Sequence, residues 1–181
     1  GGAWATDIFV ENGTVYTSGT GEASDACYWI DQTRYDLPGN WGEAEAITVH
    51  NGDVYVAGHF TTGGFNVGSC YWKNGARTNL SIPSGGDGEV QDVKIYNGSM
   101  YYFGMSMAPN NMLGYLPKAS YWKANGNRTD LPNGGGWQKG IYGGESYGGF
   151  VNSTGVYVAG KIDWIGEVDD DGQDIPGTGG S

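Results

Sequence analysis

The sequence predicts an all-β protein, a β-propeller of four blade-like repeats of four antiparallel strands, with the last repeat degenerate. Three observations predict this fold: a composition suited to strands and turns, an internal repeat, and the spacing of its copies. The 181 residues include 35 glycines, 13 tyrosines and 7 tryptophans but only 9 Lys and Arg. Gly disfavours helices and suits tight turns, whereas aromatic residues favour strands.

A first hairpin recurs four times along the chain. Each copy reads as strand, turn and strand, and the copies occupy residues 6–19, 45–58, 91–104 and 147–160. An Asn-Gly dipeptide lies in the first three turns, at residues 12–13, 51–52 and 97–98. This dipeptide is typical of a two-residue type I′ turn. The fourth copy has Ser153, Thr154 and Gly155 there, which predicts a variant of the same hairpin.

A second hairpin follows in the first three repeats. It carries a Tyr-Trp pair, an arginine, and then Asp or Asn two residues later, as in Tyr28, Trp29, Arg34 and Asp36. Because the motif recurs, we expect a structural role: the tyrosines and tryptophans pack between blades, and the planar guanidinium binds a nearby acceptor. The fourth copy lacks the Tyr-Trp pair, although we interpret residues 164–176 as a degenerate version of the same hairpin.

Cys27 and Cys70 occupy one position in neighbouring repeats. Equivalent strands of adjacent blades lie beyond the ~7 Å between Cα atoms that a disulfide tolerates. We therefore expect two buried free thiols.

The spacing of the repeats matches propeller blades. Val15, Val54, Met100 and Val156 are equivalent, and the intervals between them are 39, 46 and 56 residues. Four-stranded blades repeat every ~40–50 residues, whereas a β-sandwich, the competing architecture, does not explain a four-copy repeat. We predict a single propeller domain or propeller segment over residues 1–181, with repeats of approximately 4–40, 41–86, 87–136 and 137–181.

The ends of the repeats leave three arrangements open. Four blades close a small ring, the chain is part of a longer propeller, or two copies complete a larger ring. The last two arrangements imply a homo-oligomer or the remainder of a larger propeller as partner.

The elements Val54–Gly58 (VYVAG) and Tyr71–Gly75 (YWKNG) resemble repeats of uncharacterised secreted bacterial β-propellers. The resemblance covers nearly the whole chain. It implies an extracellular or cell-surface location and a propeller fold, but no particular activity, because propellers host many functions.

Charge and hydropathy exclude several partners. The net charge of −11 and pI near 4.3 oppose binding to nucleic acid or anionic membranes. No apolar run approaches the ~20 residues that a membrane helix needs, so we expect no membrane insertion.

Candidate ligand-binding residues lie where the repeats differ. The connection between the second and third strands grows along the chain, and Gln138 to Gly149 form a further Gly-rich insertion. Aromatic and other apolar side chains on such loops suit stacking on carbohydrate or protein ligands, although local packing explains them equally well. The predicted ligand-binding residues are Phe60, Phe65, Met112, Tyr115, Tyr142 and Tyr147.

The only candidate metal site is an acidic run near the end of the sequence. Closely spaced carboxylates around a Gly turn are typical of calcium loops, but the bidentate Glu expected at position twelve is missing, since Thr178 stands there. A solvated acidic turn is the alternative, and no cofactor is required. The candidate ligands are Glu167, Asp169, Asp171 and Asp174.

No catalytic signature is found. His50 and His59 are the only histidines, and there is no G-x-S-x-G motif. Several acids lie near the starts of first strands, where a pair could hydrolyse glycosides or simply be solvated: Asp7, Glu43, Glu45, Asp92 and Glu145. We therefore expect a non-catalytic extracellular module that binds carbohydrate or protein through loops on one propeller face. The alternatives are a structural segment that oligomerises to complete a ring, and a carbohydrate-active enzyme.

Overall fold

A computed structural model describes residues 2–22, 25–39, 41–63, 66–110, 114–132 and 140–167. These residues form fourteen strands in four antiparallel sheets, of four, four, four and two strands. The described ranges contain no α-helix. The all-β class predicted from the sequence is therefore confirmed.

Each four-stranded sheet is one sequence repeat folded as a meander, with its strands in chain order. The first sheet contains β1 (Trp4–Glu11), β2 (Thr14–Thr20), β3 (Ala26–Ile30) and β4 (Thr33–Asp36). The second sheet contains β5 (Glu43–His50), β6 (Asp53–Gly63), β7 (Asn66–Lys73) and β8 (Ala76–Asn79). The third sheet contains β9 (Asp87–Tyr96), β10 (Ser99–Asn110), β11 (Gly114–Lys123) and β12 (Arg128–Asp130). The fourth sheet pairs β13 (Gly140–Asn152) with β14 (Gly155–Glu167).

The predicted Asn-Gly turns of the first hairpins have the expected backbone. Asn51 and Gly52 both have positive φ, 53° and 81°, and the turns at residues 12–13 and 97–98 are alike. In the second hairpins the type I′ backbone recurs at Asn74 and Gly75. It does not recur at residues 125–126, where only Gly126 has positive φ. That turn is longer, because β11 ends at Lys123 and β12 begins at Arg128.

The connections that we expected to be long loops are largely strand. β6 continues to Gly63 and β10 to Asn110, and each pairs with the strand that follows it. The residues between 140 and 149 also belong to a strand, β13. Pairing gives the backbone N–H and C=O groups of these segments partners that a loop would have to find in water.

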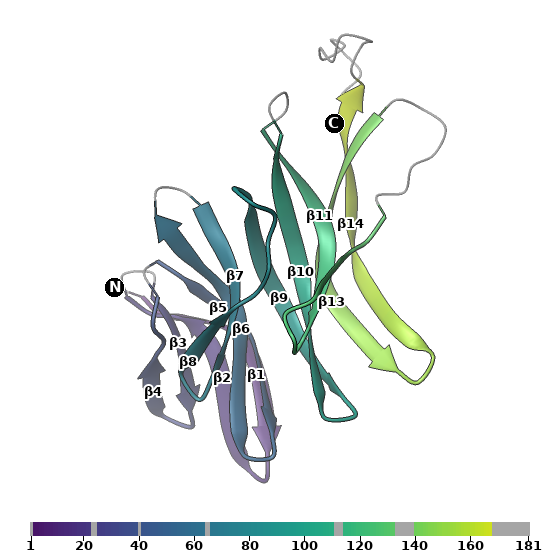
Figure 1. Ribbon diagram of the computed structural model, residues 1–181. Helices are drawn as coiled ribbons and strands as arrows, with labels where there is room; N and C mark the ends of the chain where they lie inside the picture. The colour runs from purple at the N-terminus through teal and green to yellow at the C-terminus, as the bar shows by residue number, and fades with distance from the viewer. Residues whose placement is uncertain are drawn as a thin grey trace.

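The four sheets follow one another in a row, with the first and the fourth at opposite ends (Figure 1). The first strand of each later sheet packs on the sheet before it: β5 contacts β1, β2 and β3, and β9 contacts β5, β6 and β7. β13 contacts β9, β10 and β11 in the same way. We call the side of a sheet that is turned toward the preceding sheet its rear face, and the opposite side its front face.

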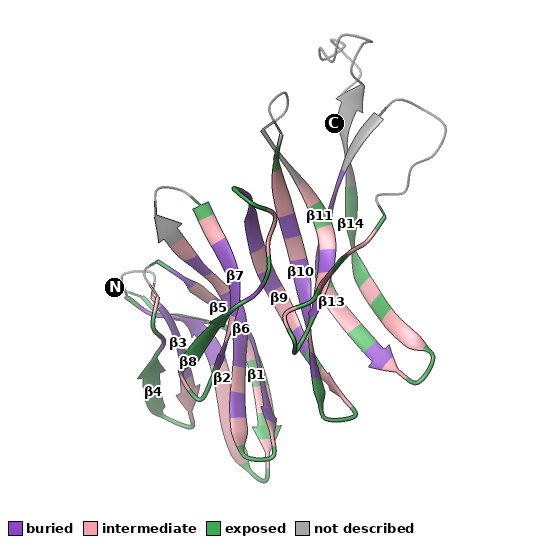
Figure 2. Cartoon of the chain, in the orientation of Figure 1, coloured by how far each residue is buried: buried purple, intermediate pink, exposed green. Residues whose placement is uncertain are grey.

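Apolar side chains form cores between successive sheets. Figure 2 shows buried positions concentrated on the strands of the second and third sheets. One core lies between the first and second sheets and includes Ile47, Val49 and Trp72. Another lies between the second and third sheets and includes Val93, Tyr102 and Trp122. Burial on both faces explains why strands such as β6 are apolar at successive positions.

The tryptophans of the second hairpins join neighbouring sheets. Trp72 and Trp122 are fully buried. The indole Nε1–H of Trp72 donates to the carbonyl of Pro38 at 3.0 Å, and that of Trp122 donates to the carbonyl of Ser81 at 2.7 Å. Both carbonyls lie just after the fourth strand of the preceding sheet. The expected packing role of these tryptophans is confirmed.

The repeated arginines are also structural. Arg34 pairs with Asp36 at 2.7 Å between Nε and Oδ1, and Arg128 pairs with Asp130 at the same distance. The second repeat has Asn79 in place of Asp, and there the guanidinium of Arg77 lies 3.8 Å from the centre of the Phe60 ring. The predicted carboxylate partner is thus replaced by a cation–π contact.

Both cysteines are buried free thiols, as predicted. The Sγ of Cys27 donates to the carbonyl of Gly19 at 3.6 Å. Burial raises the pKa of both thiols, which keeps them protonated and unreactive near neutral pH.

Across the described ranges, no helix has the length and apolar character that crossing a membrane would require.

Candidate functional site

A β-bulge occurs at the same place in all four sheets. In the second sheet the register shifts between Ala44 and Ala46, so Glu45 has no partner on β6. The first strands of the other sheets each skip one residue at the equivalent position. The unpaired residues are Thr6, Glu45, Gln91 and Tyr147. Such bulges redirect side chains and are frequent next to functional sites.

The glycine that ends each second-strand motif makes the bulge possible. A Cβ atom on Gly58 would collide with the carbonyl oxygen of Glu43 on the bulged strand. Gly19, Gly104 and Gly160 face a carbonyl in the same way. The repeated Gly of the VYVAG-type motif is therefore required by close backbone approach, not by a positive φ.

The bulges bring acidic side chains together on the first strands of successive sheets. Glu43, Glu89 and Glu145 are equivalent residues two positions before the bulge, and all three are half-buried. Glu45 adds a fourth carboxyl group from the bulge itself. We call these four residues the acidic row.

Crowding and burial change the proton affinity of the acidic row. Burial, followed by a hydrogen bond and charge repulsion from Glu43 and repulsion from Glu89, raises the pKa of Glu45 to about 7. Burial also raises the pKa of Glu89, and the charges of Glu43 and Glu145 add to the rise. Part of the acidic row is therefore protonated at neutral pH, because two close carboxylates repel each other when both are ionised.

His59 adjoins the acidic row. It is the cross-strand partner of Glu43, and its charge opposes the rise in the pKa of Glu89. Its Nδ1 atom is buried and has no hydrogen-bond partner among the described residues.

Tyr147 occupies the bulge of the fourth sheet, and its side chain is 52% exposed. Its hydroxyl donates to Oε2 of Glu145 at 2.8 Å, and Lys161 lies 3.6 Å from the same oxygen. The hydrogen bond to Glu145 raises the pKa of Tyr147. Of the six predicted ligand-binding residues, Tyr147 is the one that lies beside the acidic row with a described, exposed side chain.

The other five predicted ligand-binding residues do not join Tyr147 in a described site. Phe60 is buried, 8% exposed, in the core between the first and second sheets, beneath Arg77. Tyr115 and Tyr142 lie on β11 and β13, but their side chains are outside the description. Phe65 and Met112 lie outside the described residues.

The acids singled out from the sequence divide into two groups. Glu43, Glu45 and Glu145 belong to the acidic row, whereas Asp7 and Asp92 join neighbouring sheets. Glu89 was not among them, although it occupies the same position as Glu43 and Glu145, two residues before the bulge. The position of Gly104 opposite the bulge is the signal in the sequence that identifies it.

Asp7 and Asp92 each accept two backbone amides through separate oxygens. Oδ1 of Asp92 accepts the N–H of Val93 in its own strand at 2.8 Å, and Oδ2 accepts the N–H of Gly149 in the next sheet at 3.0 Å. Asp7 accepts Ile8 and Ile47 with the same geometry and the same two distances. These carboxylates therefore hold sheets together and are not free for catalysis.

The predicted calcium ligands lie almost entirely outside the described residues. Asp169, Asp171 and Asp174 are not described, and Glu167 is described only as the last residue of β14. Among the described residues, no group of three or more His, Cys, Asp or Glu side chains is placed to hold a metal ion.

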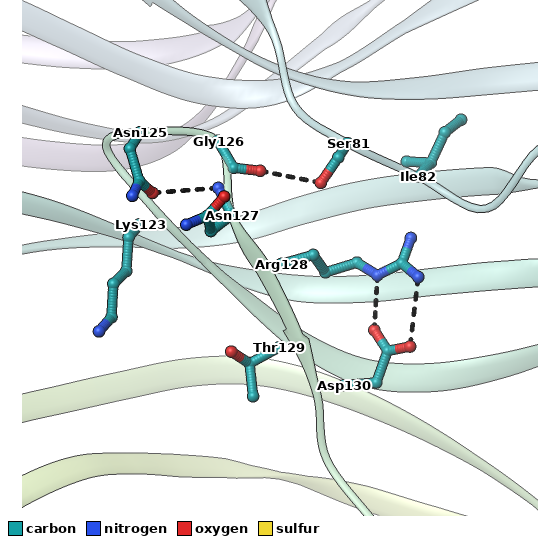
Figure 3. Close-up of a pocket in the computed structure, with 9 residues that line it drawn as sticks. All are labelled: Ser81, Ile82, Lys123, Asn125, Gly126, Asn127, Arg128, Thr129 and Asp130. Atoms are coloured by element: carbon teal, nitrogen blue, oxygen red, sulfur yellow. Dashed lines mark hydrogen bonds and ion pairs between the residues drawn. The ribbon is translucent and has the colours of Figure 1, made fainter.

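A polar pocket of about 710 Å³ lies between the second and third sheets at their outer strands. The segment after β8 and the β11–β12 hairpin line it, and Figure 3 shows their side chains. Several of its polar groups bind one another: Ser81 donates to the carbonyl of Gly126 at 2.8 Å, and Arg128 pairs with Asp130. These internal bonds indicate a structural junction rather than a ligand site.

The two outer faces of the row carry exposed apolar residues. On the rear face of the first sheet, Ile8 is 63% and Val10 58% exposed. On the front face of the fourth sheet, Phe150 is 60% and Tyr157 51% exposed, and their rings pack together. Contiguous apolar faces of this kind mark interaction surfaces.

No protein-family model matches the sequence, and no curated protein matches it either.

Proposed function

We propose that the chain is a segment of a β-propeller and that its role is structural: its outer faces stack on further sheets of the same repeat. One observation carries this proposal. Ile8 and Val10 occupy the positions of Ile47 and Val49, which are 3% and 4% exposed because the first sheet covers them. The first sheet therefore presents a rear face that is built for burial.

The direction of these side chains follows from strand alternation. Asp7 and Phe9 face the second sheet, since Asp7 binds the amide of Ile47 and Phe9 packs on the core there. Ile8 and Val10 alternate with them and so point away from the second sheet.

The indole of Trp29 supports the same interpretation. It is equivalent to Trp72 and Trp122, whose Nε1–H groups donate to the preceding sheet. Trp29 is half-buried, and its Nε1–H has no acceptor within the described ranges. A preceding sheet would supply both the apolar cover and an acceptor.

A tandem protein tests this proposal. Two copies of the chain are joined end to end, and the midpoint of thermal unfolding is compared with that of the single chain at a low protein concentration, where separate chains are not associated. Stacking at the junction predicts a higher midpoint for the tandem. Ile8→Asp with Val10→Asp in the second copy should remove this gain, whereas Gln32→Asp, in an exposed turn of the same sheet, should preserve it. A tandem that melts like the single chain contradicts the proposal.

Ligand binding along the acidic row is a second candidate function. The observation that favours it is the bulge, which releases one residue per sheet from the ladder, and these residues differ from repeat to repeat while the surrounding motif is kept. Because four carboxyl groups crowd there, the best-matched ligand is a basic segment of a protein, whose positive charge relieves their repulsion.

Calorimetry with a short oligolysine peptide tests this second candidate. A cation stabilises the ionised form of Glu45, so binding should strengthen several-fold between pH 6 and pH 8 as that carboxyl loses its proton. Glu43→Gln with Glu89→Gln should weaken binding. Equal binding by that variant, or binding of neutral oligosaccharides alone, contradicts it and favours a carbohydrate ligand.

A further inference from the structure

We infer that the front face of the fourth sheet stacks on the rear face of the first sheet of a second copy, so that copies join head to tail. This inference rests on the proposed function, that the outer faces stack on sheets of the same repeat. It adds the identity of the partner and the orientation of the joint. The argument comes from the amide groups at the junctions between sheets.

Each junction contains one first-strand amide that needs an acceptor. In the first and third sheets this amide has its own aspartate: Ile8 donates to Asp7 and Val93 donates to Asp92. The second and fourth sheets have Ala46 and Gly148 at the aspartate position. Their amides, on Ile47 and Gly149, instead donate to the aspartate of the preceding sheet.

The aspartates therefore alternate along the row, and the alternation restricts which sheet can follow the fourth. Gly148 supplies no carboxylate, so a following sheet must satisfy its own first-strand amide, since a buried amide without an acceptor is costly. The first sheet does this through Asp7. The second sheet does not, because Ile47 depends on the sheet before it.

The joint would reproduce one that the chain already contains. At the junction between the second and third sheets, the second sheet has Ala46 at the aspartate position and supplies no carboxylate. The Val93 amide therefore donates to Asp92 of its own sheet. Where a fourth sheet is followed by a first sheet, Gly148 takes the place of Ala46, and the bond from the Ile8 amide to Asp7 takes the place of the bond from Val93 to Asp92. The junction between the second and third sheets therefore serves as its template.

The exposed front face of the fourth sheet and the exposed rear face of the first sheet also match the two surfaces that meet between the first and second sheets. Phe150 and Tyr157 are equivalent to Phe9 and Tyr16, which pack against the second sheet. Gly149 and Val151 face the third sheet, because Gly149 donates to Asp92 and Val151 is buried, so Phe150 between them points away. The front face of the fourth sheet thus matches the surface on which a rear face rests.

The partner is a second copy rather than the same chain. The first and fourth sheets lie at opposite ends of the row (Figure 1), and within the described residues no extensive packing contact joins a strand of one to a strand of the other. A joint between two different faces is heterologous, and it generates closed rings or open chains of copies.

Two variants, each changed on one face, test the joint by native mass measurement at tens of micromolar protein. The rear-face variant is Ile8→Asp with Val10→Asp, and the front-face variant is Phe150→Asp with Tyr157→Asp. All four side chains are more than half exposed, so the single chain should still fold, which circular dichroism verifies. The unchanged protein should have twice the 19.2 kDa mass of one chain, or a larger multiple.

Each variant alone should be a monomer, and a 1:1 mixture should form a dimer, because one variant keeps the front face that fits the rear face of the other. An unchanged protein that is monomeric overturns the inference. A front-face variant that still dimerises also overturns it, because that result indicates two rear faces in contact. A monomeric chain whose tandem form is nevertheless stabilised overturns the association of separate copies and leaves the proposed function standing, because the faces then stack only when they belong to one chain.

Discussion

The rear faces of the first and second sheets carry equivalent side chains in opposite environments. Ile47, Val49 and Trp72 are buried against the first sheet, whereas Ile8 and Val10 are exposed and Trp29 is half-buried. The two strands do not differ in hydrophobic pattern, so the difference comes from the presence or absence of a neighbouring sheet. Stability in this protein should therefore divide into two kinds of contribution. Contributions within a sheet are similar in the three four-stranded sheets, and contributions between sheets are present only at occupied junctions.

The largest expected difference is between two tryptophans. Trp72→Ala removes a fully buried side chain and its bond to Pro38, and should cost about 3–5 kcal/mol of the free energy of unfolding. Trp29→Ala should cost less, about 1–2 kcal/mol, because its ring is only half-buried and makes no described bond to another sheet. Urea denaturation at low protein concentration, where a second copy is not bound, measures both. Equal losses would mean that the rear face of the first sheet is covered within the single chain.

The bulge glycines should behave alike at any position in the row. Gly58→Ala and Gly160→Ala each force a Cβ into a carbonyl oxygen of the adjacent strand, and should each cost about 3 kcal/mol. Gly155→Ala is the matched control, since its Cβ would meet no atom within 4 Å. Thermal unfolding of the three variants provides the measurement. A much smaller loss for Gly160 than for Gly58 would show that the bulge depends on neighbouring sheets after all.

The aspartate bonds should stabilise only the junctions that contain them. Asp92→Ala leaves the amides of Val93 and Gly149 without their acceptor and should cost about 2 kcal/mol. Lys94→Met removes only the partly exposed ion pair of Asp92 and should cost about 0.5 kcal/mol or less. Hydrogen exchange of the Gly149 amide should accelerate in the Asp92 variant alone. Unchanged exchange there would refute the bond between sheets.

The smallest expected effect depends on pH. Below its ordinary pKa of 4.5, Glu45 is protonated in both the folded and the unfolded chain and has no effect on stability. As the pH rises, the unfolded chain loses this proton first, so the folded protein is progressively destabilised until about pH 7, where the folded carboxyl also ionises. Glu45→Gln should therefore gain about 1 kcal/mol at pH 8, after allowance for solvent screening, and almost nothing at pH 4. Unfolding curves at the two pH values decide this, and a pH-independent difference would contradict the raised pKa.

Local turn chemistry and the repeat predict most of the fold. The Asn51-Gly52 turn has the backbone expected from its dipeptide, and the repeat delimits each four-stranded sheet. The connections between second and third strands were expected to be loops, yet they extend the hairpins, and Met107 pairs with Pro117 across the ladder. Pairing of this kind depends on two strands at once, so one strand's composition does not reveal it.

The candidate site was harder to predict, for the same reason. A bulge depends on the register between two strands, so the identity of the bulged residue, Glu45 or Gln91, does not predict it. The Gly that closes each second-strand motif, as in Gly58, is the sequence signal of the bulge, once close backbone approach is considered as well as turns. Phe60 illustrates the opposite difficulty, since its position in a variable connection suggested a ligand while its contacts place it in the core.

The bulge also determines how this molecule could acquire new specificities. Thr6, Glu45, Gln91 and Tyr147 contribute no cross-strand pair, so exchanging their side chains should leave the ladders in register. Thr6 also donates a hydrogen bond to the carbonyl of Ala44 in the next sheet, so its exchange should cost one contact between sheets. A hydroxyl, a carboxyl, an amide and a phenol already occupy these four positions on otherwise similar frames. Randomising these four codons together, with the opposing glycines held fixed, would give a combinatorial library whose members differ in the ligand they bind but share one fold.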